Sequence, residues 1–473
     1  MVNLDAVLSA HDEFVTVGRN ARARLLEGIG AALTADRDEL VELAHDETGI
    51  ASQRLSAEFT RTVFQLQELT AAIRSGRPFD EDECDAIAGD PPSGGPAIMR
   101  VSMPVGPVVN FEASNFPFAF GTAGCDTAAA LAAGSAVVVK IHPAHPKTSR
   151  RVLESMQRAI VDYGHRRETV FAVEGLAEGI SLVGHPGISA VAFTGSFAFG
   201  EELRRLCQLR TPPIPFFGEL GSVNPVVVAG DAARSRGAAI ADGFVTSLTT
   251  NMGQLCTKPG LFFVPKSASA GILTKVTERV AASCATRLIS RAIFERAAEH
   301  HRELRARGHE LLARSATVEP DDLAIPFSVY RTTADAVAVD AELTDEHFGP
   351  TGIVVEYVDE SDLESALDGV RGSLTVSLHA DDLSEPPVPR LVARALRTAG
   401  RVVLNGFPTG LPVRDATHHG GPFPAATDAR ATSVGANSIR RFLRPVSIQG
   451  SASDLAALRT IGSPDSIRAS LWA

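Results

Sequence analysis

The sequence predicts an α/β protein with mostly parallel sheets, and two observations carry that prediction. Short, nearly all-apolar runs rich in β-branched residues recur along the chain, as expected for strands buried on both faces of a parallel sheet. Segments with helical spacing of apolar residues lie between them, and this alternation is typical of βαβ units. The expected strands are 135–141, 188–196 and the stretches "NPVVVAG", "GLFFVP", "TGIVVEY", "LTVSLHA" and "GRVVLNG".

The remaining segments are interpreted in the same way. Residues 20–76 are predicted to be helical, because Leu26, Ile29 and Leu33 recur at helical spacing. The acidic, Pro- and Gly-rich stretch 80–96 is typical of a linker. We expect helices over 197–209 and over the Ala- and Arg-rich stretch 266–316. The Ser- and Ala-rich tail after Gln449 is expected to be loosely held.

Length and composition exclude several classes of protein. A chain of 473 residues suggests two or three domains at roughly 100–200 residues each. The net charge of −11 and the absence of a long basic cluster argue against a nucleic-acid partner. No run approaches the ~20 apolar residues of a membrane span, and the N-terminal stretch does not resemble a secretory signal. Five widely spaced cysteines fit reduced thiols in the cytoplasm better than a disulfide framework.

Cys256 lies in "TNMGQLCTKPG", among small, polar and turn-forming residues. A free cysteine is usually a small buried hydrophobe, which suits Cys125 and Cys207 in their helical contexts. It suits Cys256 poorly, because Gly253 and Thr257 provide no apolar stripe around it. Cys256 is therefore a candidate nucleophile.

Three polar residues occur at positions that suit a ligand or a reacting group. Glu219 lies between glycines in "GELGSVNP", where a carboxylate has room to approach a water molecule, although a solvated loop carboxylate is equally compatible. The amide of Asn115 in "ASNFPFAF" either donates to an oxyanion or caps the following segment. Lys140 ends an apolar strand, where ligands of open α/β sheets bind, or else extends its amine to solvent.

The stretch "FTGSFAFGEEL" predicts a strand, a turn and a helix. Gly195 allows close approach of backbone to a ligand, and Ser196 is expected to cap the helix. The N-terminus of a helix attracts phosphate, but an ordinary capped helix has the same pattern. His142 with His145, and His418 with His419, invite a metal interpretation, but neither pair has nearby carboxylates in sequence and we expect no metal.

Seven ordered stretches together resemble the aldehyde dehydrogenase superfamily over about residues 15–449. They are "PVGPVVNFEASNFPFAF", "ALAAGSAVVVKIHPAHP", "LVGHPGISAVAFTGS", "GELGSVNPVVV", "GQLCTKPG", "DEHFGP" and "GRVVLNGFPTG". Within the family, "KIHPAHP" and the C-terminal stretch from "NGFPTG" to "FLRPV" are similar to NADP-linked 2-oxoglutarate semialdehyde (2,5-dioxopentanoate) dehydrogenases.

The resemblance implies an enzyme that oxidises an aldehyde to a carboxylic acid with NADP or NAD. It implies that Cys256 attacks the aldehyde, that Asn115 and the Cys256 N–H form an oxyanion hole, and that Glu219 activates the hydrolytic water. The resemblance implies Phe116 for the substrate. Arg414 in "GLPVRDATHHGG" is either a cation for a charged semialdehyde or a surface arginine. The cofactor contacts implied by the resemblance are Lys140, His142, Gly175, Gly195, Ser196, Glu346 and Phe348.

The resemblance also implies the architecture. We expect a Rossmann-type cofactor-binding domain from 1–95 and 108–217 and an α/β catalytic domain from 218–435. A small β oligomerisation element is expected from 96–107 and 436–450, followed by a tail over 451–473. An edge strand in that element invites pairing between subunits, so a homodimer or homotetramer is expected.

Two departures from the family pattern bear on specificity. The glutamate that accepts the adenosine ribose hydroxyls in NAD-specific relatives is replaced by Pro143, so a 2′-phosphate is not repelled. The tryptophan that often precedes the Asn-Phe-Pro motif is Ser114 here, which changes only the lining of the pocket.

Other functions stay open at this point. They are oxidation of aliphatic or other aldehydes, a CoA-acylating aldehyde dehydrogenase, a cysteine hydrolase without a redox step, and a catalytically inactive structural or binding protein. The presence of Glu219 favours hydrolysis over transfer to CoA.

Overall fold

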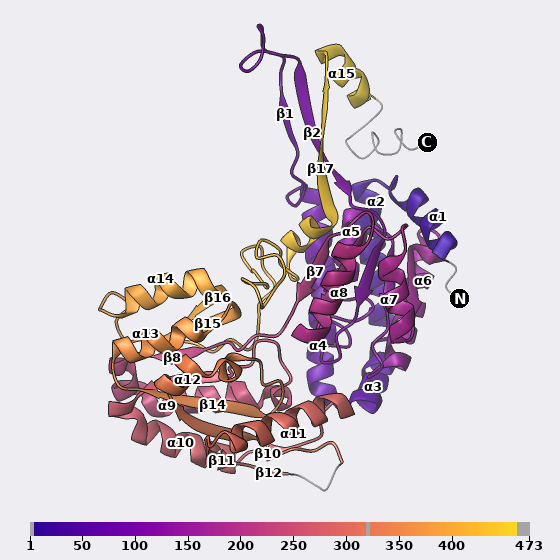
Figure 1. Cartoon of the computed structure of the whole chain (residues 1–473). Helices are drawn as coiled ribbons and strands as arrows, with labels where there is room; N and C mark the ends of the chain where they lie inside the picture. Colours follow the sequence, from indigo (N-terminus) through magenta and orange to yellow (C-terminus); the bar gives the residue numbers. More distant parts are fainter. Residues whose placement is uncertain (1–3, 318–321, 461–473) are drawn as a thin grey trace.

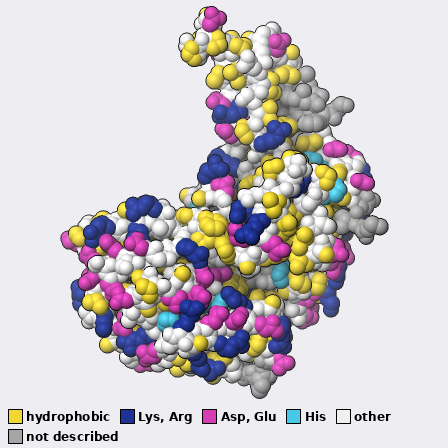
Figure 2. All heavy atoms as spheres, viewed as in Figure 1, with side chains coloured by type: hydrophobic (Ala, Val, Ile, Leu, Met, Phe, Trp, Pro, Cys, Tyr) yellow, Lys and Arg dark blue, Asp and Glu magenta, His cyan; other side chains and the backbone are white. Residues whose placement is uncertain are grey.

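The computed structural model describes residues 4–317 and 322–460. They form two α/β bodies, and a narrow three-stranded arm projects from the first of them (Figure 1). Acidic and basic side chains are intermixed over the face shown in Figure 2. No helix in the described part of the chain is long and apolar enough to cross a membrane.

The first body is built on a five-stranded parallel sheet with the order β5-β4-β3-β6-β7. The chain runs outward from β3 first through β4 to β5 and then through β6 to β7. The direction therefore reverses between β3 and β6, and such a switch point is where open α/β sheets bind ligands. The predicted strands in 135–141 and 188–196 are confirmed. The bounds are β3 (Val108–Phe111), β4 (Val137–Lys140), β5 (Val170–Val173), β6 (Ala190–Thr194) and β7 (Phe216–Glu219).

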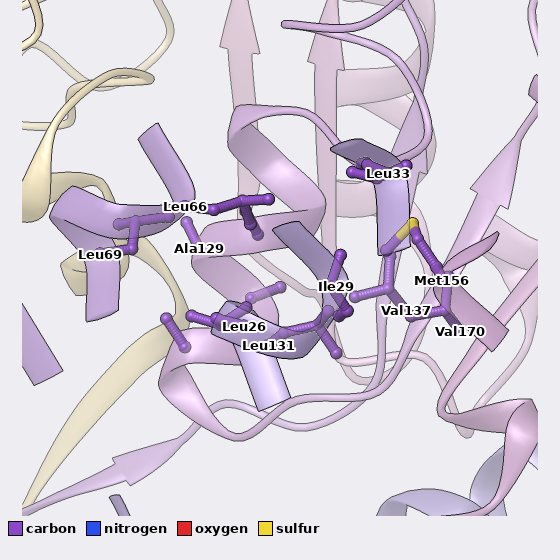
Figure 3. Packing of buried hydrophobic residues seen from close by; sticks show 14 of the residues in the cluster. Leu26, Ile29, Leu33, Leu66, Leu69, Ala129, Leu131, Val137, Met156 and Val170 are labelled. Carbon is purple, nitrogen blue, oxygen red and sulfur yellow. The ribbon is translucent and has the colours of Figure 1, made fainter. Parts of the chain in front are cut away.

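Helices cover both faces of this sheet. On one face Leu26, Leu66 and Leu131 pack against strand residues such as Val137 and Val170 (Figure 3). Each such fully buried side chain contributes about 1.5–3 kcal/mol to folding. The helices predicted within 20–76 and over 197–209 are confirmed. The helices are α1 (Leu4–Phe14), α2 (Arg19–Ala35), α3 (Arg37–Thr48), α4 (Ser52–Ser75), α5 (Cys125–Ala133), α6 (Pro146–Asp162), α7 (Leu176–Gly184) and α8 (Phe197–Leu209).

The second body holds a seven-stranded sheet with the order β11-β13-β14-β9-β8-β15-β16, parallel except for β11. Its strands are β8 (Val226–Val228), β9 (Leu261–Pro265), β11 (Glu310–Arg314), β13 (Ser328–Thr333), β14 (Thr351–Tyr357), β15 (Ser373–His379) and β16 (Ala399–Leu404). One face is covered by α9 (Gly230–Thr249), α10 (Ser269–Ala281) and α11 (Arg291–Ala306). The other is covered by α12 (Ala334–Val339), α13 (Glu360–Gly369) and α14 (Val388–Thr398).

The helical prediction for 266–316 is only partly correct. Helices α10 and α11 occupy most of the stretch, but β11 follows them and pairs antiparallel with β13. A short parallel pair, β10 (Cys284–Ala285) with β12 (Ala316–Thr317), closes the same region. Tertiary pairing overrides the helical composition here.

The arm consists of β1 (Asp82–Cys84), β2 (Ala97–Pro104) and β17 (Leu443–Gly450), all antiparallel. The linker prediction for 80–96 is therefore wrong at β1, which pairs with residues 98–100. Part of the tail is also ordered, because α15 (Ala452–Thr460) buries Leu455 against the arm. The remaining tail residues, 461–473, lie outside the described residues. The expected domain division at 217/218 falls inside β7, and that division stays a prediction.

Candidate active site

The carboxyl ends of three strands of the five-stranded sheet carry residues singled out from the sequence. Lys140 ends β4, Gly195 and Ser196 follow β6, and Glu219 ends β7. The Gly195 N–H donates to the Glu219 carbonyl at 3.0 Å, which joins the β6 turn to the end of β7. These residues thus lie at the carboxyl edge of the sheet, beside the switch point where open α/β sheets bind ligands.

A strained loop carries Cys256. Three consecutive residues before it have left-handed backbone conformations, with φ values of 51° at Asn251, 58° at Met252 and 67° at Gly253. A side chain on Gly253 would come within 2.1 Å of the Gly349 carbonyl oxygen. Strain of this kind is retained where surrounding contacts determine the conformation, and it clusters at functional sites.

Two buried polar side chains fix the other end of the loop. The Asn224 amide donates to the carbonyls of Cys256 at 2.8 Å and Lys258 at 3.0 Å. The Lys258 amine donates to the His347 carbonyl at 2.7 Å and the Thr351 carbonyl at 2.5 Å. Burial lowers the pKa of Lys258 to about 8. The loop is thereby fastened to the segment that carries Glu346 and Phe348.

Cys256, Glu219 and His419 form one cluster. The Cys256 Sγ lies 3.5 Å from His419 Nε2, and that nitrogen lies 3.0 Å from Glu219 Oε1. The Ser433 hydroxyl donates to Glu219 Oε2 at 2.6 Å. Glu219 Oε1 is buried, and it shares one small space with His419 Nε2 and the Cys256 sulfur, all three atoms lying within 4.8 Å of one another.

The segment 418–433 completes the cluster by docking on β7. The Leu220 N–H donates to the Ala425 carbonyl, and the Thr427 N–H donates to the Gly218 carbonyl. The Thr432 hydroxyl accepts a hydrogen bond from the His419 N–H at 2.9 Å. A pocket beside Glu219 is lined in part by Thr194, Gly218, His419, Thr427 and Ser433. His419 and Ser433 therefore approach the carboxylate from one loop.

The electrostatics of the cluster favour a protonated thiol at rest. Burial raises the pKa of Cys256 well above its usual value, and the carboxylates of Glu219 and Glu346 raise it further. Burial alone would raise the pKa of Glu219, but the nearby His419, Ser433 and Cys256 together bring it below its usual value. The carboxylate is thus ionised, and the sulfur needs a proton acceptor before it can attack.

Asn115 lies beside the cysteine loop. Its Nδ2 donates to the Gln254 carbonyl at 3.0 Å, and its own carbonyl accepts from Arg54 at 2.8 Å. A primary amide has two N–H donors, so one remains for another acceptor. The Cys256 N–H makes no hydrogen bond to a described residue. Phe116 is partly buried, and the Arg54 guanidinium lies 4.3 Å from its ring centroid.

The part of the molecule called the open edge consists of Lys140 at the end of β4, Gly195 and Ser196 after β6, and Gly175 at the start of α7. Lys140 is 8% exposed, burial lowers its pKa, and it makes no ion pair with a described residue. Ser196 is exposed at the N-terminus of α8, but its side chain makes no capping hydrogen bond, so the predicted cap is wrong in that respect. Gly175 is exposed with φ 90°, at the start of α7.

His142 and Glu346 border this edge and the cysteine loop. Burial, with His145 and Lys140 nearby, lowers the pKa of His142 to about 3, so its ring is neutral. Burial raises the pKa of Glu346 to about 7, against the opposing effect of Lys258. Phe348 is partly buried two residues further along the same segment.

Residues 3–423 match the family model described as "Aldehyde dehydrogenase family". The chain belongs to the aldehyde dehydrogenase family. It is therefore an oxidoreductase that oxidises aldehydes with NAD(P), as the resemblance of its sequence motifs implied.

Curated relatives support this assignment. This aldehyde dehydrogenase is 38% identical to alpha-ketoglutaric semialdehyde dehydrogenase 2 of Azospirillum brasilense, covering 92% of this chain and 83% of the relative. It is 37% identical to alpha-ketoglutaric semialdehyde dehydrogenase of Acinetobacter baylyi, covering 91% and 82%. A crystal structure of proline utilization A from Bradyrhizobium japonicum superposes with a TM-score of 0.81 at 21% identity, over 95% of this chain. The chain spans 45% of that longer protein, and the likeness concerns the fold.

The residues of the open edge fit a dinucleotide. The exposed N-terminus of α8 offers N–H groups and partial positive charge to a pyrophosphate, and the unpaired Lys140 amine can bind ribose or phosphate oxygens. Glu346 offers a carboxyl group on the side nearer Cys256. These residues would hold the cofactor between the strand ends and the cysteine loop.

Sequence reasoning missed four residues of the site: Asn224, Lys258, His419 and Ser433. His419 was weighed only as half of a metal-binding pair, and the structure brings it to Cys256, 163 residues away. Arg414 is exposed on the segment that leads to His419. Arg61 of α4 lies 5.9 Å from the Phe116 ring centroid and lowers the pKa of Cys256.

Proposed function

We propose that this aldehyde dehydrogenase oxidises 2-oxoglutarate semialdehyde to 2-oxoglutarate, with NADP used at least as well as NAD. The observation that carries the hydrolytic part of this proposal is the buried, ionised Glu219 carboxylate within 4.8 Å of the Cys256 sulfur. The substrate is supported by the two relatives named for this semialdehyde, at 37–38% identity.

The proposed chemistry divides the oxidation into two steps on one sulfur. Cys256 attacks the aldehyde carbon, and the free Asn115 N–H and the Cys256 N–H stabilise the resulting oxyanion. When bound, the nicotinamide supplies the hydride acceptor. The thioester left on Cys256 is attacked by a water molecule whose proton passes to Glu219 Oε1. Ser433 holds the other carboxylate oxygen, which fixes the direction of Oε1.

Glu219 also separates this proposal from a CoA-acylating enzyme, which needs no base for water. A catalytically inactive relative would have no need for an ionised carboxylate buried beside a cysteine, since removing a charge from water costs several kcal/mol that its partners only partly offset. A cysteine hydrolase binds no dinucleotide, so it would not need the open edge at Lys140 and α8.

The preference for NADP is supported by Pro143, which is exposed where NAD-specific relatives carry a glutamate. His142 does not supply a cation there, because its ring is neutral. Lys140 is the cation that we propose contacts the adenosine ribose or its 2′-phosphate. A kcat/KM clearly higher with NAD than with NADP would contradict this preference.

The substrate carboxylate needs a cation. Arg414 is one candidate, and Arg61 is a second because it interacts electrostatically with Cys256 and lies over Phe116. Removal of the anchoring arginine should raise KM for the charged semialdehyde while barely affecting an aliphatic aldehyde. If Arg414→Ala and Arg61→Ala each changed KM equally for the two substrates, neither arginine would be the cation that binds the substrate carboxylate.

The experiment that tests the proposal is a panel of aldehydes assayed with both cofactors. The panel includes 2-oxoglutarate semialdehyde, succinate semialdehyde and unbranched aliphatic aldehydes, and the acid product is identified by mass spectrometry. We expect the highest kcat/KM with 2-oxoglutarate semialdehyde. A higher kcat/KM with aliphatic aldehydes would show that 2-oxoglutarate semialdehyde is not the preferred substrate. A requirement for CoA would show that the acyl group is transferred to CoA instead of water.

We also propose a homodimer or homotetramer in the cytoplasm. Support for assembly comes from the projecting arm of β1, β2 and β17 (Figure 1), where Ile98 is 39% exposed. The five cysteines are all free, as expected in a reducing compartment. Light scattering that shows only monomer at micromolar concentration would contradict the assembly.

A further inference from the structure

Three side chains of metal-ligating type meet at one point of the molecule. The Cys256 Sγ lies 3.5 Å from His419 Nε2, which lies 3.0 Å from Glu219 Oε1, and the three atoms all lie within 4.8 Å of one another. Among residues 4–317 and 322–460, no other group of three or more His, Cys, Asp or Glu side chains converges in this way. In the sequence His419 has no carboxylate nearby, and the fold brings Glu219 and Cys256 to it.

The chemistry of the three groups suits one class of ion. Zn²⁺ is bound in proteins by thiolate sulfur, imidazole nitrogen and carboxylate oxygen, whereas Mg²⁺ and Ca²⁺ take oxygen ligands. With the usual bond lengths of about 2.0–2.3 Å, tetrahedral Zn²⁺ separates sulfur from nitrogen by about 3.5 Å and nitrogen from oxygen by about 3.3 Å. The observed separations of 3.5 Å and 3.0 Å therefore need to change by only a few tenths of an ångström.

Hydrogen bonds already hold each of the three groups in place. The Ser433 hydroxyl donates to Glu219 Oε2 at 2.6 Å, which leaves Oε1 toward His419. The His419 N–H donates to the Thr432 hydroxyl at 2.9 Å, and the Asn224 amide donates to the Cys256 carbonyl at 2.8 Å. Partners that orient ligating side chains in this way strengthen metal binding.

Charge and access also favour a cation at this point. The carboxylates of Glu219 and Glu346 act electrostatically on the Cys256 sulfur, and the opposing effect of Arg61 is smaller. Glu219 and His419 are buried, but Cys256 is partly exposed, so an ion can reach the sulfur from outside. The sulfur therefore lies in a negative potential that solvent can reach.

We propose that Cys256, Glu219 and His419 together bind Zn²⁺, and that the bound ion reversibly inhibits the enzyme. The S–H bond breaks as the Zn–S bond forms, and its proton leaves to solvent. The ion also takes the place of the proton that His419 Nε2 donates to Glu219. Thiolate and carboxylate carry two negative charges, which the ion neutralises.

Inhibition follows because a sulfur bonded to zinc has no free lone pair with which to attack an aldehyde. The inhibition rests on the proposed role of Cys256 as the nucleophile, whereas the binding of zinc does not. A measurement of binding and a measurement of turnover therefore test two separate statements.

The test is titration of the enzyme with Zn²⁺ by isothermal titration calorimetry. The exposed Cys84 and Cys284 are first replaced by serine, so that surface thiols do not contribute to the heat. We expect one equivalent of Zn²⁺ to bind, turnover to fall in proportion, and EDTA to restore it. Co²⁺ serves as a spectroscopic probe, and a thiolate-to-cobalt charge-transfer band should appear with wild type and be absent from Cys256→Ala.

Single substitutions distinguish a site of three ligands from binding to the thiol alone. His419→Gln and Glu219→Gln should each raise the Kd for Zn²⁺ by more than the 10–100-fold that loss of an orienting partner typically causes. The matched control is His418→Gln, because His418 is the adjacent histidine and is not in the converging group. It should keep the wild-type Kd for Zn²⁺.

The inference would be overturned if Zn²⁺ did not bind, or if both Glu219→Gln and His419→Gln bound it as tightly as the wild type. Binding of one equivalent at Cys256 without loss of turnover would instead contradict the role of Cys256 as the nucleophile. Circular dichroism checks that each variant is folded. If His419→Gln does not fold, Glu219→Gln and the wild-type cobalt spectrum decide the question.

Discussion

The Cys256 cluster and the open edge at Lys140 lie at neighbouring places in the molecule but are built differently. In the cluster, Ser433, Asn224 and Lys258 fix the carboxylate and the cysteine loop through buried hydrogen bonds. At the edge, Ser196 and Gly175 are exposed and the Lys140 amine has no ion pair in the described residues.

Under the proposed function, the difference reflects the different tasks of the two regions. Reacting groups need fixed positions before the substrate arrives, because a misplacement of about 1 Å can cost 10²-fold in rate. A dinucleotide instead supplies its own hydrogen-bonding groups, so the protein leaves its partners free until the cofactor binds. Changes in the cluster should therefore alter kcat, and changes at the edge should alter cofactor affinity.

The largest effect is expected for Cys256→Ala. Loss of the nucleophile should reduce kcat about 10⁴-fold or more. The Kd for NADP, measured by isothermal titration calorimetry, should stay at the wild-type value, because the edge is untouched. Cys84→Ala is the matched control, since Cys84 is exposed on the arm, and it should retain full turnover. Residual turnover of Cys256→Ala close to wild type would remove the cysteine from the mechanism.

Asn115→Ala should reduce kcat by about 10²–10³-fold, the usual cost of one oxyanion donor. KM for NADP should change little. Asn110→Ala provides the comparison, because the buried Asn110 amide donates to Thr127 and is expected to affect stability more than rate. Steady-state kinetics together with melting temperatures distinguish the two. A fall in melting temperature with no fall in kcat for Asn115→Ala would reduce it to a structural role.

Lys140→Met should weaken NADP binding, with the hydride-transfer step largely preserved at saturating cofactor. Loss of a hydrogen bond to a charged group costs about 1.5–3 kcal/mol, which corresponds to a Kd roughly 10–150-fold higher. The exposed Lys147 is the control, and Lys147→Met should have no such effect. A drop in kcat without a change in the Kd for NADP would mean that Lys140 acts in the chemical step and not in cofactor binding.

The smallest expected effect is a dependence of cofactor binding on pH. Burial raises the pKa of the Glu346 carboxyl to about 7, so the group is mainly protonated at pH 6 and mainly ionised at pH 8. An ionised carboxylate accepts a hydroxyl hydrogen bond more strongly. The Kd for NADP should therefore rise a few-fold, on the order of 1 kcal/mol, as the pH falls from 8 to 6. Glu346→Gln should have a flatter profile, and an equally steep one would assign the titration to another group.

The sequence was sufficient to predict those parts of the fold that depend on local pattern. The apolar β-branched runs predicted β4 and β6, and with them the placement of Lys140 and Gly195 at strand ends. The segment Asp82–Cys84 carries no such pattern. It forms β1 only because residues 98–100 offer it a partner, and that pairing is not encoded locally.

The candidate site could be predicted only where a single motif carries its own chemistry. Cys256 stood out because its neighbours are small and polar. His419 did not, because its place beside Cys256 depends on a loop that docks on β7 through backbone hydrogen bonds such as that between Leu220 and Ala425. A backbone contact of this kind can be made by almost any residue, so the sequence holds little signal for it.

Glu219→Gln offers the most direct test of the central claim, that Cys256 carries the acyl group which Glu219 then releases with water. The variant is mixed with NADP and 2-oxoglutarate semialdehyde, quenched in acid and digested, and the peptides are weighed by mass spectrometry. We predict one equivalent of NADPH, a collapse of steady-state turnover, and the mass of the acyl group on the peptide that contains Cys256. Unchanged turnover, or an acyl group on a different residue, would contradict the claim.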